Sequence, residues 1–170
     1  MKADLEAKAV KILEASRDAA IATIRPDGFP QNTTVSFVHD GLTLFIGVGS
    51  DSQKARNMRR DARVSLTITP PYQDWNHIRG LSMAAHAAEM TTQEESAEVI
   101  GLMLKRFPQI ENMDPMEGVM PSFFRLTPSV LSVLDYSLGF GHADTFTVTD
   151  TDIAESLESM KHKWLLPTGP

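Results

Sequence analysis

The segment LTLFIGVGSDSQKARNMRRDARVSLTIT, residues 42–69, decides the fold that this sequence predicts. Apolar residues occupy every second position over 42–48 and again over 64–69, a spacing typical of half-buried β-strands. Small residues at 47–52 follow the first strand, and a short basic helix leads from them into the second strand. We therefore predict a strand, a turn, a helix and a strand, which together hold the only concentrated positive charge of an acidic protein.

The composition is that of a soluble protein with one domain. Its 170 residues suit a single domain over 1–170, with a core at about 15–150, and two independent domains are not expected. No stretch reaches the ~18 apolar residues of a membrane helix, and the charged N-terminus lacks the apolar region of a signal peptide. The net charge of -6 argues against a nucleic-acid partner. Without cysteine there is no disulfide framework or thiolate chemistry, and a cytoplasmic location is expected.

Short strands and tight turns continue through the rest of the chain. Helical spacing of apolar residues predicts amphipathic helices at 3–16, 92–107 and 152–164. Alternating or short apolar runs predict further strands at 19–24, 31–38, 80–90, 123–126, 130–136 and 145–148. Thr127-Pro128 is expected to separate the strand at 123–126 from the strand at 130–136. The pattern indicates a mainly β protein, a small antiparallel barrel with helices at the N-terminus, in the middle and at the C-terminus.

Five of the sixteen Lys and Arg residues fall within ten positions: Lys54, Arg56, Arg59, Arg60 and Arg63. Such a run is usually a solvated helix face. An anion site is the alternative, because a helix N-terminus attracts anions through its free N–H groups and its dipole. Ser52 and Lys54 lie in the first turn, where a hydroxyl and an ammonium can share one phosphate. We predict that Ala55, Met58 and Ala62 form the inward stripe of this helix.

Four segments of the chain carry a family resemblance: AAIATIRPDGFPQNTTVSF, LTLFIGV, SQKARNMRRDARVSLTI and GLSMAAHAAEM. Over about residues 15–150 the chain resembles the pyridoxamine 5'-phosphate oxidase-like FMN-binding split-barrel family, most specifically at Ser52-Gln53-Lys54 with Asn57 and the residues at 60–66. The resemblance implies a six-stranded Greek-key split β-barrel. It also implies a homodimer that holds FMN in a cleft between the subunits, with the Ser-x-Lys motif on the flavin phosphate.

The resemblance also implies which residues contact the cofactor. Residues of the second and third strands would lie along the flavin, the Ser-x-Lys motif would hold the phosphate, and the Trp75 to Ser82 stretch would come from the partner subunit or the cleft rim. The implied contacts are Thr33, Thr34, Val35, Ile46, Gly47, Ser52, Gln53, Lys54, Trp75, Arg79 and Ser82. From the residues alone, Trp75 covers a bound ring or packs on the barrel. Arg79 likewise meets a phosphate, a substrate carboxylate or an ordinary ion-pair partner.

The chain also departs from the oxidases of that family. It has no Arg near Thr33, and Gln53 replaces the Arg that precedes the Lys, so that Arg56 is expected to substitute for it. The pyridoxal-phosphate-binding residues of the C-terminus are not matched, and vitamin-B6 oxidation is therefore not expected. The C-terminal segment DYSLGFGHADTFTV resembles FMN-type members and, through Gly139-Phe140-Gly141, also the heme-utilisation members. The next residue, His142, is a loop histidine or, less readily, a heme ligand. The other histidines have no metal-binding spacing.

The function that these observations favour is an FMN-dependent oxidoreductase, which transfers a hydride between a nicotinamide or small organic substrate and FMN. No catalytic residue is assigned, since there is neither a G-x-S-x-G elbow nor a cysteine nucleophile. Two alternatives stay open. One is a non-catalytic flavin or heme binding protein of the same fold, and the other is a deazaflavin-dependent reductase.

Overall fold

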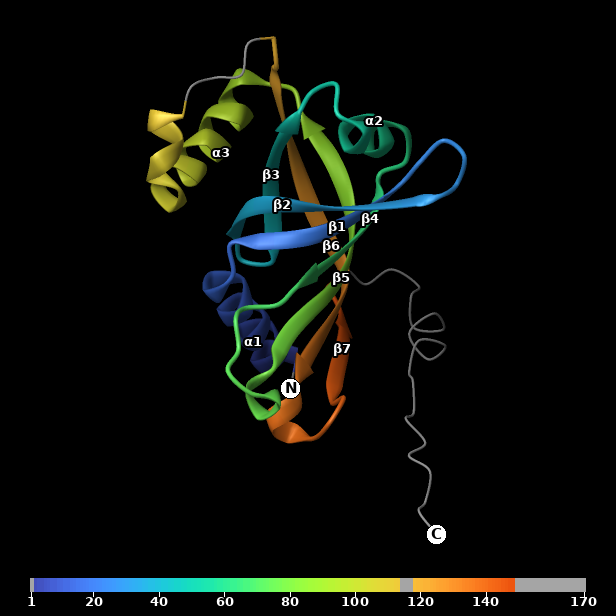
Figure 1. Ribbon diagram of the computed structural model, residues 1–170, viewed down its shortest axis with the longest axis vertical. Helices are drawn as coiled ribbons and strands as arrows, with labels where there is room; N and C mark the ends of the chain where they lie inside the picture. Colours follow the sequence, from blue (N-terminus) through green and yellow to red (C-terminus); the bar gives the residue numbers. More distant parts are fainter. Residues whose placement is uncertain (1, 114–117, 149–170) are drawn as a thin grey trace.

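The computed structural model of the chain describes residues 2–113 and 118–148 (Figure 1), so the helix predicted at 152–164 lies outside the described residues. Seven strands form one antiparallel sheet: β1 (Asp18–Ile24), β2 (Pro30–Asp40), β3 (Thr43–Gly49), β4 (Arg63–Ile68), β5 (Arg79–Met90), β6 (Pro121–Asp135) and β7 (Ala143–Thr147). The strand order is β3-β2-β1-β4-β5-β6, and a further pairing of β3 with β6 closes the barrel. The predicted six-stranded antiparallel barrel is thus confirmed. Its β3-β2-β1-β4 order is that of a Greek key.

β6 is one continuous strand, and the break predicted at Thr127-Pro128 is wrong. Its first half pairs with β3 from Pro121 to Leu126, and its second half pairs with β7 from Val130 onward. Pro128 lies between these two halves, opposite a register shift on β5. A proline has no N–H to donate to a sheet, so it is tolerated at the point where the strand changes neighbours.

Three helices cover the barrel. α1 (Lys2–Ala15) lies against β5, β6 and β7 at the lower end in Figure 1, whereas α2 (Gln53–Arg60) lies against β1, β5 and β3 at the upper end. α3 (Gln93–Arg106) follows β5 and contacts β2. It begins at a capping box, in which Thr92 Oγ1 accepts from the N–H of Glu95. Short 3₁₀ turns are η1 (Trp75–His77), η2 (Pro108–Asn112) and η3 (Tyr136–Leu138).

The core fills the barrel and continues under α1. Inward side chains such as Phe37, Leu66 and Leu126 are at most 1% exposed, and Leu13 of α1 joins them. Arg106, at the end of α3, donates to the carbonyl oxygens of Leu13, Glu14 and Ser16, and its guanidinium carbon lies 5.7 Å from the Phe37 ring centroid. Within the described ranges, no helix has the length and apolar character needed to span a membrane.

Candidate functional site

The N-terminal turn of α2 begins at a side-chain cap and has two backbone N–H groups without an acceptor among the described residues. Ser52 is the N-cap, and its Oγ accepts from the N–H of Ala55 at 3.3 Å. The N–H of Ser52 itself donates to the carbonyl of Gly49. No acceptor among the described residues takes the N–H groups of Gln53 and Lys54, which are the first two positions of the helix. These two donors lie at the N-terminus of α2, which is the positive end of the helix dipole.

Two side chains lie close to these free N–H groups. Gln53 lines a hollow of about 460 Å³ with Arg25, Asp27 and Gln31, between the β1–β2 turn and α2. Arg56 donates to Gln53 Oε1 at 3.1 Å and also to the carbonyl of Asp51. Arg56 thus lies beside the N-terminal turn. This is the position expected if Arg56 substitutes for the Arg that Gln53 replaces.

A buried amide fixes α2 on the barrel. Asn57 is 0% exposed, and its Nδ2 donates to Thr23 Oγ1 at 3.0 Å and to Gln31 Oε1 at 3.3 Å. Its Oδ1 accepts from Gln53 Nε2 at 2.8 Å. The predicted inward stripe is correct for Ala55 and Met58, which are buried, but wrong for exposed Ala62, because α2 ends at Arg60 and Ala62 lies beyond it.

The remaining basic residues of the cluster are exposed, as predicted, but each has a protein partner. Arg59 pairs with Glu89 of β5 through two hydrogen bonds of 2.7 and 2.6 Å. The hydrogen bond from Arg59 is the main reason that the pKa of the Glu89 carboxyl is lowered. Arg60 donates to the carbonyls of Ile24 and Arg25, and Arg63 pairs with Asp61. In contrast, no ion pair joins Lys54 to any residue of the described ranges.

The predicted contacts on β2 and β3 divide between the core and the outer face. Val35 and Ile46 are buried at 5% and 0% exposure, so only their backbone groups can reach a ligand outside the barrel. Thr34 is exposed and Thr33 is half-buried. Gly47 is exposed on β3, where an added Cβ would lie 3.1 Å from Cε1 of Phe123.

Thr34 belongs to a row of small side chains that crosses the outer face of the sheet. It pairs with Ala20, Ala20 pairs with Thr67, and Thr67 pairs with Ser82. Directly paired residues point to the same face, so Thr34 and Ser82 look outward together, about 14 Å apart across three strand spacings. The row continues through Ser132 of β6 onto β7. This face has no bulky side chain along the row and allows close approach of a planar ring or of another sheet.

Arg79 and Trp75 lie at the other end of the molecule from α2. β5 starts at Arg79 and reaches the α2 end at Glu89. At about 3.3 Å per strand residue, the two ends are roughly 30 Å apart. Arg79 makes an ion pair with Asp135 at 3.3 Å and donates to Ser137 Oγ. One chain therefore does not bring all the predicted cofactor contacts together, and Ser82 lies between the two groups.

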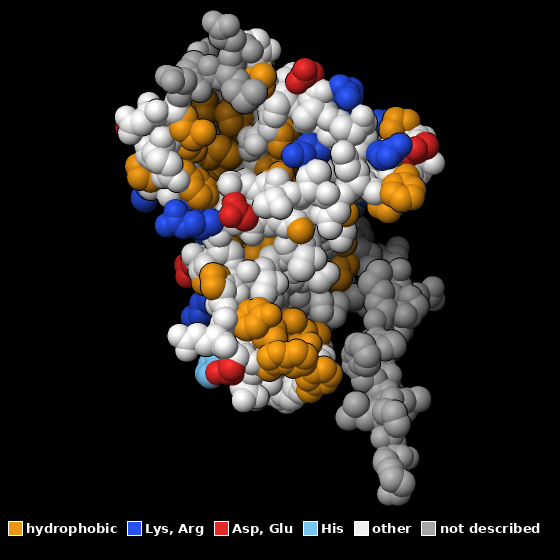
Figure 2. Space-filling model, viewed as in Figure 1, with side chains coloured by type: hydrophobic (Ala, Val, Ile, Leu, Met, Phe, Trp, Pro, Cys, Tyr) orange, Lys and Arg blue, Asp and Glu red, His pale blue; other side chains and the backbone are white. Residues whose placement is uncertain are grey.

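Trp75 belongs to an exposed aromatic cluster, and the sequence did not predict the other two members, Tyr136 and Phe140. Its ring stacks on Phe140, with centroids 5.6 Å apart and an interplanar angle of 9°, and Tyr136 contacts both rings. Trp75 and Phe140 are 64% and 63% exposed, and hydrophobic side chains gather on the surface at this end of the molecule (Figure 2). Phe140 comes from the Gly-Phe-Gly segment, so this segment and the Trp75 loop contact each other and form one exposed surface.

His142 is held by a neighbouring carboxylate. Its Nε2 lies 3.0 Å from Asp144 Oδ2, and its side chain is 35% exposed. His77 makes a similar contact, since its Nδ1 lies 2.8 Å from Asp74 Oδ1. Among the described residues, no group of three or more His, Asp and Glu side chains is arranged to hold a metal ion.

Comparison with known proteins finds the same fold. A sequence model described as pyridoxamine 5'-phosphate oxidase matches residues 5–133, while no curated protein sequence matches the chain. Among solved structures, the chain is similar to a heme binding protein from Mycobacterium smegmatis, with a TM-score of 0.70 and 19% identity over 84% of this chain. The chain spans only 57% of the length of that protein.

Two further solved structures cover nearly the whole of both chains. The heme storage protein HutZ from Vibrio cholerae has a TM-score of 0.60 and 19% identity, covering 81% of this chain and 90% of its own. A Clostridium acetobutylicum protein related to general stress protein 26, of the pyridoxinephosphate oxidase family, has a TM-score of 0.62 and 13% identity, covering 85% and 95%. At these identities the likeness shows a shared fold.

Proposed function

The chain belongs to the pyridoxamine 5'-phosphate oxidase family, and we propose that it is a flavoprotein that binds FMN and acts as an oxidoreductase on a small organic or nicotinamide substrate. The observation that carries this proposal is the N-terminal turn of α2. There the N–H groups of Gln53 and Lys54 and the Lys54 ammonium, which have no partner among the described residues, offer the donors that a phosphate monoester needs.

The chain's own residues would bind and orient the cofactor. Ser52, Gln53 and Lys54 hold the phosphate, with Arg56 beside them, and the outer face around Thr34 supports the ring. FMN when bound accepts or delivers a hydride. The protein's part in this reaction is then to position the ring and to exclude water.

A phosphate-specific measurement tests this proposal. We expect the purified protein to bind FMN more tightly than riboflavin, which has the same ring but lacks the phosphate. Lys54→Gln should weaken FMN binding about tenfold to a hundredfold, because a charge-assisted contact is lost, and should leave riboflavin binding nearly unchanged. Lys105→Gln, an exposed lysine of α3, is the matched control. Equal losses of both flavins in Lys54→Gln, or no FMN binding by the wild type, would refute the proposal.

We further propose that the site is completed by a second copy of the chain. The two groups of predicted contacts lie roughly 30 Å apart in one chain, and a two-fold partner can bring the Arg79 end of one copy to the α2 end of the other. The row of small outward side chains that includes Thr34 and Ser82 suits such a contact between sheets.

Mixed dimers test the shared site. A dimer of one Lys54→Gln chain and one Arg79→Gln chain should contain one intact site and one doubly altered site, so it should bind one FMN at wild-type affinity. If each site lies within one chain, both sites of the mixed dimer should be weakened. A monomer at micromolar concentration in light scattering would also contradict the shared site.

Heme binding is the second candidate, because two of the similar structures are named for heme. His142 is half-exposed beside the aromatic cluster, and Asp144 occupies its Nε2, which leaves Nδ1 as the nitrogen for iron. Titration with hemin should then give a Soret band that is lost in His142→Ala and kept in His77→Ala, a histidine that is likewise paired with a carboxylate. Equal bands in both variants would exclude His142 as the ligand.

A further inference from the structure

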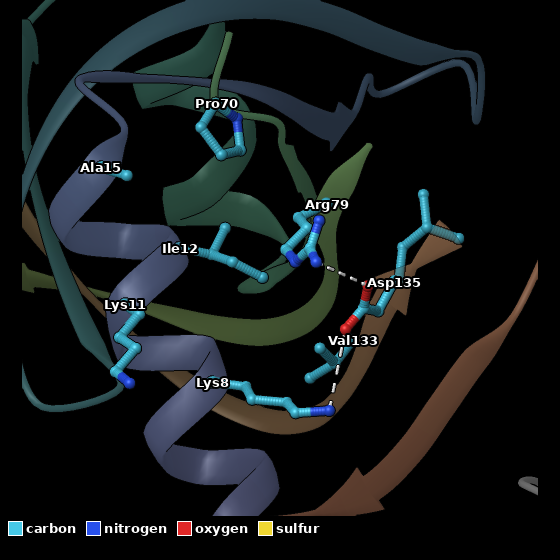
Figure 3. Close-up of a pocket in the computed structure, with 9 residues that line it drawn as sticks. Lys8, Lys11, Ile12, Ala15, Pro70, Arg79, Val133 and Asp135 are labelled. Carbon is cyan, nitrogen blue, oxygen red and sulfur yellow. Dashed lines mark ion pairs between the residues drawn. The ribbon is translucent and has the colours of Figure 1, made fainter. Parts of the chain in front are cut away.

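A cavity of about 360 Å³ lies between α1, the start of β5 and the end of β6, at the end of the barrel away from α2 (Figures 1 and 3). Cationic side chains, apolar groups and one carboxylate line it. They are Lys8, Lys11, Ile12, Ala15, Pro70, Arg79, Val133, Leu134 and Asp135. A cavity of this size is at the lower limit of small-molecule sites in proteins.

The charges of this cavity do not balance. Asp135 Oδ2 lies 3.7 Å from Lys8 Nζ, and its Oδ1 lies 3.3 Å from Arg79 Nη2 (Figure 3). Oδ1 also accepts from the N–H and the hydroxyl of Ser137, so the one carboxylate of the lining is already fully used. Lys11 forms no ion pair with a residue of the described ranges. Three cations and one carboxylate leave the lining with two excess positive charges.

An apolar wall stands next to these cations. Ile12 projects from α1 toward Arg79, and Val133 lies below it on β6 (Figure 3). Both side chains belong to the edge of the core, at 5% and 2% exposure, so the wall is rigid. An uncharged ligand would leave the excess cations without a partner.

We propose that this cavity binds a small organic anion, of the size of an aryl or short-chain carboxylate. Its carboxylate lies beside Arg79, where Lys8 and Lys11 add positive charge to the lining, and its apolar part lies on Ile12 and Val133. A planar guanidinium and a nearby ammonium are the usual partners of a carboxylate. The cavity shares Arg79 with the proposed flavin site between two copies, whereas Lys11 and Ala15 line the cavity and belong to neither part of the flavin site.

Ligand-observed NMR titration of the full chain tests the proposal with three probes of one shape. We expect 4-phenylbutyrate to bind at millimolar or lower concentration, and its neutral amide and the corresponding amine to bind at least tenfold more weakly. Lys11→Gln should weaken 4-phenylbutyrate about threefold to tenfold, and raised salt should weaken it in the wild type. Ala15→Phe should abolish binding by filling the cavity, because Ala15 lines it from an exposed position at the end of α1. Lys105→Gln is the control and should change nothing.

Three results would overturn the proposal. These are equal affinity for the acid and its neutral amide, equal loss in Lys11→Gln and Lys105→Gln, and full binding by Ala15→Phe. FMN affinity should be unchanged in Lys11→Gln and Ala15→Phe, so this site can fail or succeed independently of the flavin site. Circular dichroism and the thermal transition of each variant show whether a loss of binding reflects unfolding.

Discussion

Replacing Asn57 by alanine should destabilise the protein more than any exposed substitution in α2. The buried amide makes three hydrogen bonds, to Thr23, Gln31 and Gln53, and its removal leaves the Thr23 hydroxyl, which is 1% exposed, without this partner. At about 1 kcal/mol for each net hydrogen bond and 1 kcal/mol or more for a stranded buried group, the expected loss is about 2–4 kcal/mol. For a chain of this length that is a fall in Tm of roughly 5–15 °C.

Urea unfolding at fixed protein concentration, followed by circular dichroism, measures this loss. Asn112→Ala, an exposed asparagine in η2, is the control and should change the free energy of unfolding by less than about 0.5 kcal/mol. Thr23→Val combined with Asn57→Ala should cost less than the sum of the two single changes, because the second change removes a group that the first has already stranded. A loss of less than about 0.5 kcal/mol in Asn57→Ala, or strict additivity in the double variant, would refute this account of how α2 is fixed.

Two further predictions concern charged groups at the ends of the barrel. Burial alone would raise the pKa of Asp135, but hydrogen bonds from Ser137 and the charges of Arg79 and Lys8 outweigh it, and the pKa is lowered. The stability that Asp135 contributes is therefore present above its unfolded pKa of about 3.9 and is lost as the pH falls through the folded pKa. At pH 7 we expect the free energies of unfolding of wild type and Asp135→Asn to differ by about 1–2 kcal/mol, and urea titrations should show this difference shrinking below about pH 4. A difference that grows below pH 4 would contradict the lowered pKa. Arg106→Gln should lower the free energy of unfolding by about 1–3 kcal/mol, because the carbonyls at the end of α1 lose their charged donor. Amide hydrogen exchange should show the last turn of α1 opening first in this variant, and unchanged exchange in that turn would contradict the role of Arg106.

The strands were predictable because their evidence is local. Alternation of apolar residues at 42–48 and 64–69 reports which face of a strand is buried, whatever its neighbours are. The break at Pro128 was predicted wrongly for the same reason. A local rule excludes proline from a paired strand, but the change of neighbours from β3 to β7 that permits it is a property of the whole sheet.

The candidate site was predictable only where it is continuous in the sequence. The N-terminal turn of α2 was expected from Ser52 and Lys54, and the structure adds the free N–H groups beside them. The burial of Asn57 was not expected, because its partner Thr23 lies 34 residues away in the sequence. The partner of Arg59 and the aromatic partner of Trp75 are similarly distant, and no local pattern identifies them.

The pairing of β3 with β6 gives the barrel a seam that should close late in folding. Most strand pairs join segments that are near neighbours in the sequence, whereas Gly47 must find Phe123 across α2, β4, β5 and α3. The chain entropy lost on closing so long a loop must be spent before the seam gains any contact. Pulse-labelled hydrogen exchange during refolding should therefore protect the β1–β2 amides before those of β3 that face β6. Simultaneous protection would show that the seam forms within the nucleus itself.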